Sequence, residues 1–178
     1  MTSLKIIKGS CADQEVDVVV VVVVNAANKN LFFGSGICGA IFEKAGIKEL
    51  SEECKKIPTP LEVGEAVITP SCNMTNCKYI IHVPGPDFRY EDNSFDKLYQ
   101  AYYNSLNLAK NNNLHSISFP LISSGTYAGT IKNPSLKSAE KCIEAYNDFI
   151  DKNKDYEINV LLCAYTSRDY DEIKDLKI

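Results

Sequence analysis

The stretch "DVVVVVVVNAANKN", residues 17–30, decides the fold of this 178-residue chain. Its seven consecutive valines are apolar on both faces of an extended chain, as in a central strand that helices cover on each side. The run is too short to cross a bilayer, which takes about 20 residues. In open α/β sheets, ligands bind beyond the carboxyl ends of such strands. The asparagines and alanines that follow the valines are therefore candidates for a binding site.

Other apolar segments predict further strands, and they alternate with helical patterns. We expect strands at 3–9, 65–71, 79–83, 116–122 and 158–165 in addition to the valine run. This order predicts an α/β fold. We expect a single domain over residues 1–178, built as a three-layer α/β/α sandwich with a mixed, mainly parallel central sheet.

The helical segments have recognisable boundaries. Apolar spacing from Ile37 to Lys56 predicts helix with a break near Gly46. Ser94 is expected to cap a helix that runs to about Asn111, and Asn133 to cap one that begins at Pro134. A short helix is expected at the C-terminal end.

Composition limits the classes of function. With 45% hydrophobic and 24% charged residues, the chain is typical of soluble globular proteins. A net charge of −4 argues against a broad electrostatic grip on nucleic acid. The seven cysteines form no C-x-x-C pair, and His82 and His115 lack zinc-motif spacing. We expect free thiols, no metal site, no membrane association and a cytoplasmic monomer.

Two glycine-rich loops follow predicted strands and each leads into a helix. The first, "NAANKNLFFGSGICGA", spans residues 25–40, and the second, "PLISSGTYAGTIKNP", spans residues 120–134. Glycine lets backbone N–H groups approach a ligand closely, and a helix N-terminus adds partial positive charge. Two such loops suit a ligand with two phosphates. A third loop, "HVPGPDF" at 82–88, contains prolines that stiffen a turn near the same edge.

The common nucleotide fingerprints do not fit. "GSGICG" at 34–39 matches G-x-G-x-x-G, but the acidic residues about 20 positions later, Glu52 and Glu53, fall in a predicted helix rather than at a strand end. No G-x-x-x-x-G-K-[ST] motif is present.

Three segments together are more specific. "VNAANKNLFFGSGICGAIFEKAG", "VGEAVITPSCNMTNCKYIIHVPGP" and "FPLISSGTYAGTIKNP" resemble the macrodomain family in order, spacing and strand context, from about Ile6 to Tyr165. The resemblance implies a mixed sheet between helices, with a cleft that binds ADP-ribose and needs no cofactor. Many members, microbial and viral ones included, hydrolyse ADP-ribose from modified acidic side chains or deacetylate O-acetyl-ADP-ribose. Others only read the mark.

The resemblance also assigns roles to individual positions. Asn28 matches the asparagine that orients the distal ribose and a nearby water, and is the candidate catalytic residue. Asn25 is expected to pack the strand end, and Tyr127 to cover the distal ribose. Tyr165 matches an aromatic that packs on adenine, although an aromatic at a strand end can also be simple core or rim. The full set of expected ligand-binding positions is Ser10, Cys11, Asn25, Ala26, Gly34, Ser35, Gly36, Ile37, Cys38, Pro86, Ser123, Ser124, Gly125, Thr126, Tyr127 and Tyr165.

Ser10 is a first departure from the family pattern. Members usually carry an aspartate there, which accepts a hydrogen bond from the adenine amino group. A hydroxyl can accept that bond but lacks the charge that strengthens it. Asp13 can substitute only if the loop folds differently.

Cys38 and Phe42 are a second departure, since one hydrolytic subgroup has aspartate and histidine at these positions. Phe42 cannot transfer a proton. Cys38 is either a nucleophile or, on the simpler interpretation, a small residue packed at the helix start. A mechanism without these groups relies on Asn28, on backbone donors of the loops, and on the substrate's own phosphate to activate water.

The length of the valine run is a third departure, because the chain from Asp17 to Asn25 is longer than in many cellular members. Either the strand is longer or the sequence is irregular there. His82, inside an apolar strand, is expected to be a hydrogen-bonded core histidine rather than a base.

Three functional hypotheses follow. The first is an enzyme that removes mono-ADP-ribose from acidic side chains of proteins. The second is a non-catalytic reader that binds ADP-ribose or ADP-ribosylated proteins. The third, prompted by Ser10, is a degenerate domain for another ligand, such as another nucleotide or RNA. The acidic charge balance makes RNA the weakest of these candidates.

Overall fold

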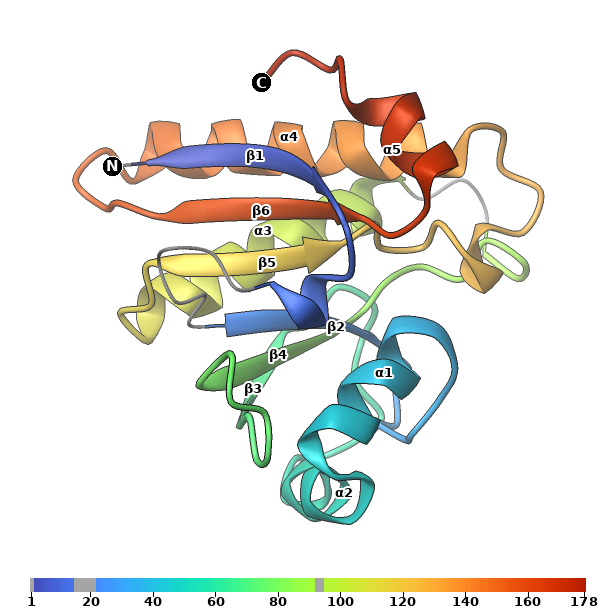
Figure 1. Ribbon diagram of the computed structural model, residues 1–178, viewed down its shortest axis with the longest axis vertical. Helices are drawn as coiled ribbons and strands as arrows, with labels where there is room; N and C mark the ends of the chain where they lie inside the picture. The colour runs from blue at the N-terminus through green and yellow to red at the C-terminus, as the bar shows by residue number, and fades with distance from the viewer. Residues whose placement is uncertain (1, 15–21, 92–94) are drawn as a thin grey trace.

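The computed structural model describes residues 2–14, 22–91 and 95–178. Within them, a six-stranded sheet has the order β1-β6-β5-β2-β4-β3 (Figure 1). Its strands are β1 (Ser3–Lys8), β2 (Val22–Ala27), β3 (Val67–Pro70), β4 (Tyr79–Pro84), β5 (Ser116–Pro120) and β6 (Asn159–Ala164). Neighbouring strands are parallel except for the antiparallel pair β3–β4. The prediction of a mixed, mainly parallel sheet is confirmed.

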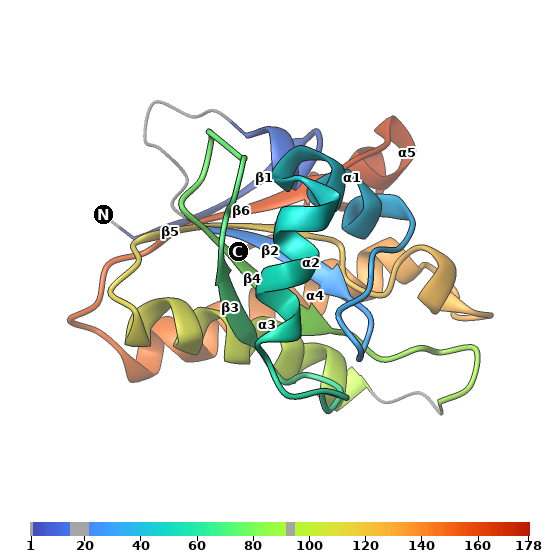
Figure 2. The same ribbon diagram turned by 90° about the horizontal axis from the view of Figure 1, so that it is seen from below.

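Helices cover both faces of this sheet (Figures 1 and 2). The described helices are α1 (Gly36–Ala45), α2 (Ile47–Lys55), α3 (Phe95–Asn111), α4 (Pro134–Lys152) and α5 (Ser167–Ile173). Two short 3₁₀ turns are η1 (Cys11–Asp13) and η2 (Thr126–Ala128). Helices α3 and α4 pack against one face of the sheet, α1 and α2 against the other, and α5 contacts β1, β6 and α4. No helix in these ranges is long and apolar enough to span a membrane.

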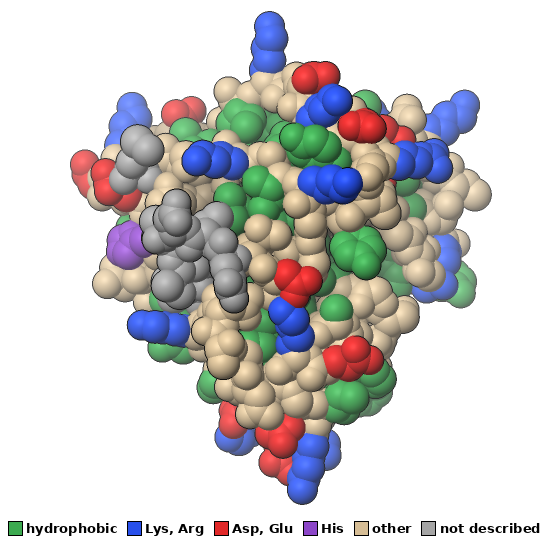
Figure 3. Space-filling view, in the orientation of Figure 1, with side chains coloured by type: hydrophobic (Ala, Val, Ile, Leu, Met, Phe, Trp, Pro, Cys, Tyr) green, Lys and Arg blue, Asp and Glu red, His purple; other side chains and the backbone are tan. Residues whose placement is uncertain are grey.

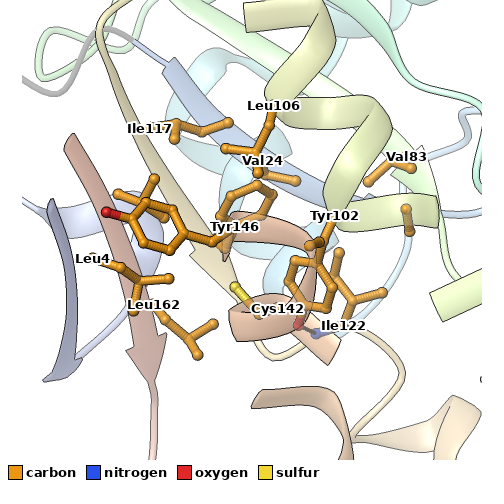
Figure 4. Close-up of a cluster of buried hydrophobic side chains, with 14 of the residues drawn as sticks. Leu4, Val24, Val83, Tyr102, Leu106, Ile117, Ile122, Cys142, Tyr146 and Leu162 are labelled. Carbon is orange, nitrogen blue, oxygen red and sulfur yellow. Dashed lines mark hydrogen bonds between the residues drawn. The ribbon is translucent and has the colours of Figure 1, made fainter. Parts of the chain in front are cut away.

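Strand β2 is buried on both faces, as the valine run predicts. Val24 belongs to the core under α3 and α4, together with Tyr102 and Leu106 (Figure 4). Val23 belongs to the core under α1 and α2. Burying a valine side chain contributes about 2 kcal/mol, so Val23 and Val24 stabilise the layers on the two faces of the sheet. The earlier part of the stretch, residues 17–21, lies outside the described residues. The prediction of an unusually long strand falls on those residues and stays a prediction.

Gly46 separates two helices where the sequence predicts a break. It ends α1 and precedes α2 with a φ of +89°, a conformation that glycine adopts at little cost. The break turns α2 toward β3.

The prediction for Asn133 is wrong in one respect. Helix α4 begins at Pro134, as expected, but the Asn133 side chain makes no capping hydrogen bond. Asn133 adopts a left-handed conformation (φ 51°, ψ 56°), whereas a capping side chain normally requires an extended backbone. The predicted Ser94 cap lies outside the described residues.

Candidate functional site

A cavity of about 660 Å³ lies at the carboxyl ends of the parallel strands. Ala26 of β2, Pro120 of β5 and Cys163 of β6 contribute to its wall, and Gly9 follows β1. The cavity is lined by Gly9, Ser10, Cys11, Asp13, Ala26, Asn28, Gly34, Ser35, Gly36, Ile37, Cys38, Ala40, Pro120, Leu121, Ser123, Ser124, Gly125, Thr126, Tyr127, Cys163, Tyr165 and Asp169. The structure thus brings together all the predicted site residues except Asn25 and Pro86.

The first wall is the loop that enters α1. Gly36 has a φ of +61°, and a side chain added there would meet no atom within 4 Å. Ser35, at the N-cap, makes no side-chain capping hydrogen bond. The N–H groups of the first helical turn have no acceptor within their own helix, and the helix dipole favours negative charge there. This wall can therefore receive a phosphate.

The second wall is the loop from Leu121 to Tyr127. Ser123 has a φ of +60°, and its hydroxyl donates a hydrogen bond to the Pro86 carbonyl at 2.7 Å. The Ser124 hydroxyl donates to the Leu121 carbonyl at 2.7 Å. At Gly125, as at Gly36, an added side chain would meet no atom within 4 Å. These two hydrogen bonds fix the loop, and Gly125 leaves open space beside it.

A buried hydroxyl pair fixes the base of this second loop. The Tyr102 hydroxyl accepts a hydrogen bond from the Ile122 N–H at 2.9 Å and contacts the Ser138 hydroxyl at 2.6 Å. Ser138 in turn donates to the Ile122 carbonyl at 2.6 Å. Burial raises the pKa of Tyr102 well above its usual range, so the hydroxyl stays protonated. Residues of α3 and α4 thereby set the position of the loop.

Asn28, just after β2, has a fixed side-chain orientation. Its Nδ2 donates to the Phe32 carbonyl at 2.8 Å, and its Oδ1 accepts from the Phe32 N–H at 2.9 Å. An amide has two donor hydrogens and two acceptor lone pairs. One of each therefore remains for a ligand in the cavity.

Asn25 and Pro86 do not line the cavity, unlike the other positions predicted to bind ligand. Asn25 is fully buried because its side chain points from β2 into the core under α1 and α2. Its Nδ2 contacts His82 Nδ1 at 3.0 Å. Pro86 lies behind the second loop, where its carbonyl holds Ser123.

His82 is a buried, hydrogen-bonded histidine, as predicted. Its Nε2 lies 2.9 Å from Thr69 Oγ1, and its other ring nitrogen contacts Asn25. Burial lowers the pKa of His82 to about 3, so the ring is neutral.

The structure favours the core interpretation of Cys38 over the nucleophile. Burial raises the pKa of its thiol, and Sγ donates to the Phe32 carbonyl at 3.6 Å. A thiol kept protonated is a poor nucleophile. Phe42 is fully buried and lies away from the cavity wall.

Ser10, the position expected to accept a hydrogen bond from the adenine amino group, already accepts one within the protein. The Ser10 hydroxyl accepts from the Ala12 N–H at 3.2 Å and caps η1. Asp13 at the end of η1 does line the cavity, where it forms an ion pair with Lys44. Tyr165 is 76% exposed and so lies at the rim rather than in the core.

Sequence reasoning missed several lining residues, of which Asp169 is chemically the most distinctive. Its carboxylate accepts from the Ser135 hydroxyl and from the Thr166 hydroxyl, each at 2.7 Å. The Asp169 N–H donates to Thr166 Oγ1, so Thr166 caps α5. The Thr-x-x-Asp spacing after the last strand resembles a capping box and could have located it. The other missed positions are Gly9, Ala40, Pro120, Leu121 and Cys163.

The family model described as "Macro domain" matches residues 24–134, more than half of the chain. The chain belongs to the macro domain family. A macro domain-containing protein of Caldanaerobacter subterraneus is 36% identical over 172 residues, which cover 94% of this chain and 91% of that protein. A protein of Escherichia fergusonii named O-acetyl-ADP-ribose deacetylase is 37% identical over 154 residues, covering 84% and 81%.

Solved structures agree with the family membership. The Oceanobacillus iheyensis macrodomain, solved with ADP, superposes on this macro domain with a TM-score of 0.85. The two are 30% identical, and the match covers 98% of this chain and 89% of that one. The predicted three-layer α/β/α macrodomain fold is confirmed.

Proposed function

We propose that this macro domain binds ADP-ribose in the cavity and hydrolyses ester bonds at the distal ribose. The substrates would be O-acetyl-ADP-ribose and mono-ADP-ribosylated acidic side chains of proteins. Relatives named O-acetyl-ADP-ribose deacetylase, at 37% and 39% identity, support the enzymatic part of the proposal. The Oceanobacillus structure with ADP supports the nucleotide part.

One observation carries the proposal: two loops with open glycines face a single cavity. Gly36 and Gly125 each leave space where a side chain would otherwise stand. Loops of this kind let backbone N–H groups approach phosphate oxygens. A diphosphate placed between them would direct its distal ribose toward the end of the cavity that holds Asn28.

The chemistry available near Asn28 is positioning and polarisation. The amide offers one N–H donor and one acceptor lone pair, in an orientation set by Phe32. Cys38 is a protonated thiol, and Phe42 is buried carbon. We infer that a water held by Asn28 attacks the ester carbonyl while a substrate phosphate oxygen accepts its proton. The alkoxide formed on the carbonyl oxygen collapses and breaks the bond to the ribose oxygen. That oxygen takes the proton back from the phosphate and leaves as the ribose hydroxyl, and the carboxylic acid is released.

The second candidate is a non-catalytic reader, which binds ADP-ribosylated proteins without hydrolysing the bond. It is favoured because each of the two carboxylates that line the cavity among the described residues already has a partner within the protein. Asp13 is paired with Lys44, and Asp169 accepts from Ser135 and Thr166. RNA binding has less support, because Lys and Arg side chains lie among Asp and Glu on the face shown in Figure 3.

The test is a release assay with wild type and Asn28→Ala on an auto-modified transferase that carries mono-ADP-ribose on acidic residues. Removing one preorganised amide donor typically costs about 100-fold in turnover. We expect wild type to release the label, and Asn28→Ala to release it about 100-fold more slowly while unfolding at a similar temperature. Binding without release by wild type would support the reader, and equal release by both proteins would refute the role of Asn28.

A further inference from the structure

A chain of buried hydrogen bonds joins the sheet interior to the site loop. It runs from Thr69 on β3 to His82 on β4 (2.9 Å), and from His82 to Asn25 on β2 (3.0 Å). Asn25 Nδ2 also lies 3.7 Å from Cys38 Sγ at the start of α1. All four side chains are buried. Three strands and one helix therefore share one polar network.

The network ends on the group that holds Asn28. Cys38 Sγ donates to the Phe32 carbonyl at 3.6 Å, and Asn28 Nδ2 donates to the same oxygen at 2.8 Å. A side chain added at Gly34 would meet both Cys38 Sγ (3.6 Å) and Asn28 Nδ2 (3.8 Å). The buried network and the candidate catalytic amide thus meet at one carbonyl oxygen.

The direction of each hydrogen bond follows from which side-chain atoms carry a hydrogen to donate. Nδ2 of Asn25 can only donate, so Nδ1 of His82 must accept and the ring proton must lie on Nε2, where it can donate to Thr69 Oγ1. The second Nδ2 hydrogen of Asn25 is directed at Cys38 Sγ, whose own proton then points to the Phe32 carbonyl. One histidine tautomer is therefore consistent with the whole network.

Stability alone does not account for Asn25. Its Oδ1 is buried and has no hydrogen-bond partner among the described residues. Such an acceptor is a cost, and apolar residues of similar shape at all the partnered positions would avoid it. The neighbouring β2 residues Val23 and Val24 show that this strand otherwise uses such residues.

We propose that Thr69, His82 and Asn25 are positioning residues: through Cys38 they fix the Phe32 carbonyl, and through it the orientation of Asn28. His82 and Asn25 do not line the cavity, so they act from behind it. The proposal rests on the proposed function for its catalytic consequence, but its structural part holds for the free protein.

The experiment compares wild type with the apolar triple variant Thr69→Val/His82→Phe/Asn25→Leu. Amide exchange at Phe32 and the Asn28 side-chain NH₂ resonances are followed by NMR in the free protein. We expect the triple variant to unfold at the wild-type temperature or above, with exchange at Phe32 at least about tenfold faster. Turnover should fall about tenfold or more with little change in KM, since misplacing a positioned group by about 1 Å can cost 100-fold.

Val83→Ala is the matched control, because Val83 neighbours His82 on β4 but faces α3 and α4. It should lower stability without changing exchange at Phe32. Should the triple variant not fold, Thr69→Val alone carries the test. Loss of the Thr69 hydroxyl should shift the His82 ring away from the Nε2–H tautomer and speed exchange at Phe32.

Unchanged exchange and unchanged Asn28 resonances in the triple variant, or in Thr69→Val if that is the protein that folds, would overturn the proposal. These readouts do not require ADP-ribose. A wild type that neither binds nor hydrolyses ADP-ribose would refute the proposed function and leave the exchange result as the test of the network.

Discussion

Tyr102→Phe should loosen the second loop of the cavity and destabilise the protein. The Tyr102 hydroxyl is the acceptor for the buried Ile122 N–H, and Ile122 directly precedes Ser123 of the cavity wall. Phenylalanine keeps the ring contact with Phe119, whose centroid is 5.1 Å away, so no large cavity forms. The change isolates one hydroxyl.

The expected magnitude follows from the group left without a partner. A buried donor without an acceptor costs about 1–3 kcal/mol. Ser138 keeps its bond to the Ile122 carbonyl, which limits the loss to this range. We therefore expect about 2 kcal/mol of lost stability, or a fall in Tm of about 4–8 °C for a chain of this size.

Urea unfolding measures this loss as a shift in the midpoint at constant m-value. The control is Tyr90→Phe, because Tyr90 is 83% exposed and its change should stay within about 0.5 kcal/mol. In a double-mutant cycle with Ser138→Ala, the two changes should be non-additive, since both residues bond to Ile122. A loss under about 0.5 kcal/mol for Tyr102→Phe, or strict additivity, would refute the account of the loop anchor.

Three further predictions concern the first wall of the cavity, the buried His82 and the buried thiols. Gly36→Val places a branched side chain at a φ of +61° in the open space of the first wall, so ADP-ribose should bind at least about tenfold more weakly by calorimetry. The folded-state pKa of His82, about 3, lies below the ordinary 6.5, so the unfolded chain binds the extra proton between these values. The free energy of unfolding should therefore fall as the pH drops from about 6.5 to 3, by up to roughly 5 kcal/mol from His82. The urea midpoint should decline over this pH range, and it should decline less in His82→Gln. Burial raises the pKa of Cys38 and Cys163, so iodoacetamide at pH 7.5 should label the native protein far more slowly than the unfolded protein, by mass spectrometry; comparable labelling rates in the two states would contradict that account of the thiols.

The sequence predicts those features that local chemistry determines. A run of valines specifies a strand buried on two faces, and Gly46 specifies a helix break, because each depends on its own residues. The sequence also indicates the loops that form the cavity, because parallel strands end at one edge of a sheet. Most of the predicted site residues line the cavity for that reason.

Features that depend on distant residues could not be predicted. The hydroxyl of Tyr102 reaches Ile122 across 20 positions, and Asn25 meets His82 across 57. The family resemblance includes Asn25 among the ligand-binding positions, but the alternation of side chains along β2 directs its side chain into the core. The side chain of Asn133 does not cap α4, because its backbone adopts a left-handed conformation that residue type alone does not reveal.

The most direct test of the central claim is a calorimetric titration of the wild-type protein with ADP-ribose. We expect saturable heat for one site per chain, weakened by Gly36→Val and retained in Tyr90→Phe. No heat at high micromolar ADP-ribose would contradict the account, because the cavity between the two glycine loops would then not be an ADP-ribose site.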